Sequence, residues 1–138
     1  MIRFECDYAE GAAPQLLERL TRTNLEQTPG YAVDGHCQRA RDLIRAACAA
    51  PQAEVEFLVG GTQANQTVIS AALRPYQGAL CAQTGHINVH ETGAIEATGH
   101  KVLPLPSQDG KITPKQVEQF CAVHWADPTR EHIVQPGM

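Results

Sequence analysis

Two glycines and a threonine separate an apolar run from an amphipathic segment in "EVEFLVGGTQANQTVISAAL", residues 54–73. If a strand runs through Gly60 and Gly61 into a helix that begins near Thr62, several unpaired backbone N–H groups lie at the positive end of the helix dipole. A phosphate fits such a turn, because glycines let its oxygens approach the backbone and the Thr62 hydroxyl can donate to it. The pattern predicts an anion site, above all for a phosphate group.

A simpler interpretation of the same turn stays open at this point. Thr62 can cap a helix after a tight turn, and strand-glycine-helix turns are ordinary in α/β proteins. The turn is no P-loop, because G-x-x-x-x-G-K-[ST] is absent, and two glycines do not make a dinucleotide fingerprint. The local pattern alone therefore does not identify the ligand.

A second cluster, in "QTGHINVHETGAIEATGHKV", brings His86, His90, Glu91 and His100 within fifteen residues. One interpretation of this cluster is a metal site. On a helix, His86 and His90 would share a face and be two ligands, and Glu91 would be the third. However, Thr84-Gly85 favours a turn over a regular helix, and the H-E-x-x-H arrangement is absent. We expect no metal site, and a histidine that merely packs or forms a hydrogen bond remains an alternative for this cluster.

The elements that would position these residues follow from periodicity and caps. A capping box of Thr113 and Gln116 predicts the last helix, and Asp34 can cap the second. Helices are expected over residues 14–27, 35–50, 62–73 and from 114, and strands over 54–59, "GALCA" and "HKVLPLP". A short helix is expected between the last two strands. This order predicts an α/β layer with mostly parallel strands.

Composition narrows the class of protein. The chain has 138 residues, of which 43% are apolar, so one domain with a core is expected. A net charge of −4 and a pI near 5.8 argue against nucleic acid and membrane partners. The five cysteines contain no C-x-x-C pair, so we expect reduced thiols. Charged residues interrupt the amino-terminal segment where a signal peptide needs an apolar run, so we expect a cytoplasmic protein.

Five blocks of sequence occur in an order that resembles one family. They are "DYAEGAAPQLLERL", "NLEQTPGY", "FLVGGTQANQTVISAAL", "TGHINVHETGAIEATGHKV" and "DGKITPKQVEQF". Together they resemble the amino-terminal blocks of the threonine aldolase and aromatic amino acid β-eliminating lyase family, pyridoxal-phosphate enzymes of the aspartate-aminotransferase fold. The resemblance implies an incomplete part of the large cofactor-binding α/β domain. Residues 1–33 would form an amino-terminal helix and a substrate or interface loop, and residues 34–138 the partial cofactor-binding domain.

The resemblance also implies roles for residues at matching positions. Gly60, Gly61 and Thr62 stand where the family holds the cofactor phosphate, with Gly60 in place of a serine. His86 matches the histidine that stacks on the pyridine ring, which makes it both a cofactor-binding and a catalytic candidate. Glu91 matches an acidic residue and is a substrate-binding candidate.

Other matching positions depart from the family or concern its assembly. Cys6-Asp7 replaces the usual Ser-Asp, so Cys6 is a candidate for the substrate site and Asp7 for a structural role. His90 stands where many members have tyrosine. Tyr31 lies in a loop that in relatives reaches an active site, sometimes that of a neighbouring subunit, and it is a further substrate-site candidate. A small amino-acid substrate and a homo-oligomer, dimer or tetramer, are implied.

The chemistry needs a lysine that carries the cofactor and an acid at the pyridine nitrogen. Neither Lys101, Lys111 nor Lys115 has the family's context for that lysine. We expect the amino-terminal portion of a lyase that cleaves a β-hydroxy amino acid to glycine and an aldehyde, or performs β-elimination, and we expect it to be inactive alone. Residues 54–59 would then lack strand partners. The alternative function is a non-catalytic α/β module that binds a phosphorylated small molecule.

Overall fold

A computed structural model describes residues 5, 6 and 8–138. The chain divides into two compact units, residues 1–57 and 58–138, and each is described by itself. The division at residue 33 that the resemblance implies concerns roles in an enzyme, and it stays a prediction. Asp7 lies outside the described residues, so its structural role also stays a prediction.

The first unit contains two helices, α1 (Pro14–Thr23) and α2 (Gly35–Ala47). The start of α2 confirms the predicted cap: Asp34 Oδ1 accepts from the N–H groups of His36 at 2.9 Å and Cys37 at 3.0 Å. Helix α1 ends four residues before the predicted limit. The hydroxyl of Thr23 donates to a main-chain carbonyl four residues earlier, a bond that competes with the regular helix.

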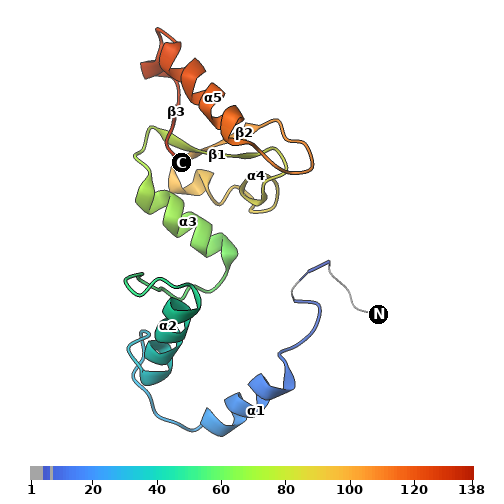
Figure 1. Cartoon of the computed structure of the whole chain (residues 1–138), viewed down its shortest axis with the longest axis vertical. Coiled ribbons are helices and arrows are strands. Elements are labelled where there is room, and N and C mark those ends of the chain that lie inside the picture. The colour runs from blue at the N-terminus through green and yellow to red at the C-terminus, as the bar shows by residue number, and fades with distance from the viewer. Residues whose placement is uncertain (1–4, 7) are drawn as a thin grey trace. The chain divides into compact units, whose positions relative to one another are not determined.

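The second unit is built on a parallel sheet with strand order β2-β1-β3, as Figure 1 shows. Strand β1 (Gln77–Ala82) is central and pairs along its length with β2 (Lys101–Leu105). Strand β3 (Gln135–Pro136) pairs with the start of β1. The predicted strands in "GALCA" and "HKVLPLP" and their parallel direction are confirmed, whereas no strand was predicted at the position of β3.

Helices cover both faces of this sheet (Figure 1). Helix α3 (Gly61–Ala72) contributes Ile69 to a buried cluster with Ala79 of β1 and Val102 of β2. The next residue of β2, Leu103, points to the other face and lies with Phe120 of α5 around a shallow hollow. Helices on both faces are the arrangement expected of a parallel sheet.

The remaining elements connect the strands. Helix α4 (His86–Val89) is a single turn after β1, followed by the 3₁₀ helix η1 (Glu96–Thr98). Helix α5 (Pro114–Ala126) begins with the predicted capping box, in which Gln116 N–H donates to Thr113 and the Thr113 N–H donates to Gln116. A second 3₁₀ helix, η2 (Arg130–His132), precedes β3.

Residues 54–59 have the pattern of a strand but form none in this chain, which confirms the expected lack of strand partners. These residues run without a helix or a ladder into α3. An extended segment becomes a strand only when neighbouring strands satisfy its N–H and C=O groups, and none of the described strands pairs with it. Within the described part of the chain, no helix is long and apolar enough to cross a bilayer.

Candidate functional site

The glycine turn opens α3. Gly60 is the residue before the first helical turn, with extended backbone angles, and it has no side chain with which to cap the helix. The N–H groups of Gly61, Thr62 and Gln63 have no acceptor among the described residues. A Cβ added at either glycine would meet no heavy atom within 4 Å. Three donors at the positive end of a helix therefore face open space.

The interpretation of Thr62 as the cap of this helix is wrong. Thr62 is the second residue of α3, and its exposed hydroxyl has no hydrogen bond to the described residues. The local bond is made instead by Gln63, whose Oε1 accepts from Val59 N–H at 2.7 Å. This bond fixes the turn and leaves the Thr62 hydroxyl free to donate to an anion, as the phosphate hypothesis requires.

A second tight turn positions His86 just after β1. Gly85 has to be a glycine here, because a Cβ would lie 2.9 Å from the carbonyl oxygen of Ala82 and 3.3 Å from Cys81 Sγ. Desolvation on burial raises the pKa of the Cys81 thiol, so this packed side chain is neutral near pH 7. His86 opens α4 at the carboxyl end of β1, and 63% of its side chain is exposed.

Glu91 joins His86 to α3. Its side chain is fully buried, and its Oε1 lies 2.7 Å from His86 Nδ1. The same oxygen accepts from Asn65 Nδ2 at 2.6 Å. Oε2 is buried without a partner among the described residues. A chain of hydrogen bonds thus runs from the second turn of α3 to the His86 ring.

Asn65 is the residue that sequence reasoning missed. It stands on α3 five positions after Gly60, and the available signal was a polar residue on the inward face of an amphipathic helix. Because the helix that carries the phosphate-type turn also holds Asn65, the structure connects the two predicted clusters. Sequence analysis treated these clusters separately.

The other two histidines lie in different surroundings. The His90 ring is exposed and lies 5.4 Å from the His86 ring between centroids. His100 is buried and its Nδ1 lies 3.2 Å from the Gln77 carbonyl oxygen, so the packing alternative describes this histidine. In the described part of the chain, no three side chains of His, Cys, Asp or Glu are grouped so as to hold a metal ion.

The two substrate-site candidates in the first unit are placed only within that unit. Tyr31 is fully exposed, and it and Ala32 both have positive φ angles, 62° and 58°. Arg41 holds this uncommon backbone: its Nη1 donates to Ala32 O at 2.7 Å and its Nε to Val55 O at 3.0 Å. Cys6 is half-buried. The substrate-binding roles of Cys6, Tyr31 and Glu91 stay predictions.

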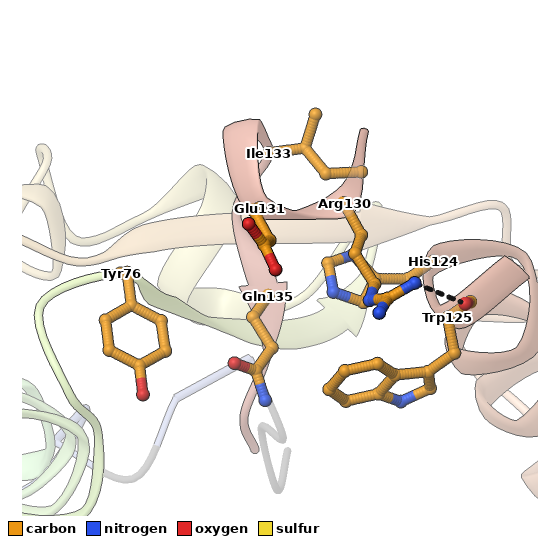
Figure 2. Close-up of a pocket in the computed structure, with 7 residues that line it drawn as sticks. All are labelled: Tyr76, His124, Trp125, Arg130, Glu131, Ile133 and Gln135. Atoms are coloured by element: carbon orange, nitrogen blue, oxygen red, sulfur yellow. Dashed lines mark hydrogen bonds between the residues drawn. The ribbon is translucent and has the colours of Figure 1, made fainter. Parts of the chain in front are cut away.

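A hollow lies away from these residues in the second unit. Its volume is about 420 Å³, and Figure 2 shows the side chains around it: Tyr76, His124, Trp125, Arg130, Glu131, Ile133 and Gln135. Tyr76 precedes β1 and Gln135 begins β3, so this hollow is at the amino ends of the strands. His86 follows the carboxyl end, where parallel α/β sheets bind ligands, and we place the candidate site there.

Fold and site together define a class: a parallel α/β chain with an anion-type helix terminus and a buried carboxylate-histidine pair beyond the carboxyl end of its central strand. The sequence model of the family described as beta-eliminating lyase matches residues 6–134. The chain therefore belongs to the beta-eliminating lyase family, whose members depend on pyridoxal phosphate.

Individual relatives agree with this membership. Low specificity L-threonine aldolase of a Pseudomonas species is 28% identical, over 96% of this chain and 40% of that protein. The enzyme of the same name from Pseudomonas aeruginosa is 27% identical, over 91% of this chain and 38% of that protein. The solved structure of Leishmania major threonine aldolase superposes with a TM-score of 0.86 at 45% identity, over 94% of this chain and 37% of that chain.

These matches confirm the predicted family and fold class. They also establish a fact of length: the chain spans about 40% of the curated relatives it matches. What the complete relatives do therefore does not transfer directly to this stretch of sequence.

Proposed function

We propose that this chain supplies the phosphate-binding turn and the cofactor-facing histidine of a pyridoxal-phosphate-dependent lyase. The leading reaction is cleavage of a β-hydroxy amino acid such as L-threonine to glycine and an aldehyde, and β-elimination is the second. One observation carries the proposal: the amino end of α3 and His86 are joined by the hydrogen-bonded chain through Asn65 and Glu91.

The residues present fit the cofactor. A phosphate needs several donors at one point, and Gly61, Thr62 and Gln63 offer three unpaired N–H groups with the Thr62 hydroxyl beside them. The absence of side chains at both glycines leaves the approach open. Substitution of the family's serine by Gly60 removes one hydroxyl and leaves the backbone donors in place.

Pyridoxal phosphate held at this turn would supply an electron sink for the pair left on the substrate's α-carbon when its bond to the β-carbon breaks. Breaking that bond also requires loss of the proton of the β-hydroxyl group, because the β-carbon becomes an aldehyde carbon. A neutral imidazole with the proton on Nδ1 can take that proton at Nε2. We assign this role, together with orientation of the cofactor ring, to His86.

Further parts of the proposal rest on the family resemblance. The exposed side chains of Lys101, Lys111 and Lys115 make poor carriers of a cofactor, so a lysine outside this stretch would supply the amine. Tyr31 and Cys6 would approach the substrate in a homo-oligomer of dimeric or tetrameric form. We also propose a cytoplasmic location.

Binding is tested by titrating the ¹⁵N-labelled protein separately with pyridoxal phosphate, inorganic phosphate and a nucleotide. We expect pyridoxal phosphate and phosphate to shift the amide signals of Gly61 and Thr62. In a protein that contains this chain and the rest of the fold, we expect aldehyde release from L-threonine, measured with a coupled dehydrogenase. Failure of pyridoxal phosphate to shift these amides would contradict the proposal.

The exposure of all three lysines favours one alternative, a non-catalytic module that binds a phosphorylated small molecule through residues 60–62. The same titration separates the two functions. Tight binding of a nucleotide without binding of pyridoxal phosphate would favour the module.

A further inference from the structure

Glu91 is unusual because its carboxylate is buried. Its side chain has no exposed surface, although burial of a charged group is costly unless donors compensate it. Both donors in reach of it, Asn65 Nδ2 and His86 Nδ1, meet the same oxygen, Oε1. This concentration on one oxygen suggests that the contact serves the histidine as well as the carboxylate.

The two short contacts fix the direction of the hydrogen bonds. An amide nitrogen only donates, and an ionised carboxylate only accepts. With Glu91 ionised, the 2.7 Å contact between His86 Nδ1 and Glu91 Oε1 places a proton on Nδ1. In a neutral ring the other nitrogen, Nε2, then carries a lone pair.

Asn65 anchors this arrangement to α3. Its neighbour Gln66 donates to the carbonyl oxygen of Ala94 at 3.0 Å, so adjacent residues of one helix reach the loop after α4. Of these two adjacent residues, only Asn65 forms a hydrogen bond with Glu91. The two amides thus provide a pair of similar hydrogen bonds, of which one reaches the carboxylate and the other reaches the backbone.

We propose that Asn65 and Glu91 are positioning residues that hold the His86 imidazole with its proton on Nδ1 and leave Nε2 as the acceptor. Asn65 orients the Glu91 carboxylate, and Glu91 selects the tautomer and the ring orientation. Glu91 acts through His86 and does not touch the substrate. The inference rests on the proposed function only in that His86 faces the cofactor and substrate.

The direct test is the tautomer of His86 in the protein without cofactor. Side-chain ¹⁵N NMR of histidine-labelled protein distinguishes a protonated from a bare ring nitrogen, and His86→Ala identifies the signals. In the neutral ring we expect the proton on Nδ1. A predominant Nε2–H tautomer would overturn the proposal.

Three variants separate positioning from packing. Glu91→Met keeps the length of the side chain but removes the acceptor at Nδ1, so we expect the Nδ1–H population to fall. Asn65→Leu should reduce the Nδ1–H population, whereas Gln66→Met, the matched control, should leave it unchanged. Far-UV circular dichroism checks folding, and the similarly long Glu91→Met keeps the test valid if Asn65→Leu does not fold. An unchanged tautomer in Glu91→Met would refute the inference.

A kinetic measurement in the complete enzyme adds a second readout. Glu91→Met should lower kcat by about 100-fold, the lower end of what a positioned proton acceptor contributes, with little change in KM. A raised KM at unchanged kcat would instead indicate direct substrate binding by Glu91. If the tautomer responds as expected but pyridoxal phosphate does not bind, the proposed function fails and the positioning role stands.

Discussion

Substitution of Gly61 by valine tests the phosphate site with little disturbance of the fold. Gly61 is the first residue of α3, and a Cβ at this position has no heavy atom within 4 Å. Because Cα–Cβ bonds tilt towards the amino end of a helix, the valine methyl groups would project over the unpaired N–H groups of the first turn. They would occupy the space that the phosphate oxygens need.

The magnitude follows from the hydrogen bonds that would be lost. Three backbone N–H groups, those of Gly61, Thr62 and Gln63, are available to the phosphate. Leaving one or two hydrogen-bonding groups unpaired costs about 1–3 kcal/mol. We therefore expect the Kd for pyridoxal phosphate to rise by about 5- to 160-fold.

The assay is equilibrium binding of pyridoxal phosphate, followed by the visible absorbance of the cofactor, in a protein that contains this chain and the rest of the fold. Gly35→Val is the matched control, because Gly35 is the first residue of α2 and its Cβ position is equally open. Both variants should keep the wild-type urea unfolding midpoint. An unchanged Kd in Gly61→Val would show that Gly61 is only a turn residue.

Three further predictions concern the fold. Ile95→Ala removes the largest fully buried side chain among the described residues and should lower the free energy of unfolding by about 2–5 kcal/mol, measured by urea denaturation. Gly78→Ala would place a Cβ 2.6 Å from the Lys101 carbonyl oxygen, so we expect loss of amide-exchange protection along β1 and β2. Hydrogen bonds from the Cys37 side chain and main chain lower the pKa of Asp34 from 3.8 to about 2. The stabilisation of α2 by the Asp34 carboxylate should be complete above the ordinary pKa of 3.8 and should disappear as the pH falls through the lowered pKa of about 2. Circular dichroism follows the loss of helix, and an Asp34→Asn variant that loses helix over the same pH range would refute this prediction.

The features that sequence predicted well depend on neighbouring residues. Asp34 and the Thr113–Gln116 pair mark helix starts because the bonds they make lie within a few residues of the chain. The glycine turn at residues 60 and 61 and the short helix after β1 were likewise predicted from local patterns. Such signals require no knowledge of the rest of the fold.

Long-range partners decide where strands form. Residues 54–59 have the apolar pattern of a strand, yet the described strands offer them no ladder. Residues 135 and 136, which gave no strand signal, become β3 because Gln135 N–H reaches the carbonyl oxygen of Tyr76 at 3.1 Å. Strand formation is decided by the presence of a partner, which a local pattern does not reveal.

By itself the sequence determined the helix starts, the parallel α/β class, the glycine turn and the family resemblance. Only the tertiary structure decided that Glu91 is buried and that Asn65, 26 residues earlier, donates to it. Packing of Ile69 and Ile95 into one core draws α3 against the loop after α4, which makes this long-range bond available. Spacing along the chain carries no information about such a contact, because the contact depends on how a helix packs on a sheet.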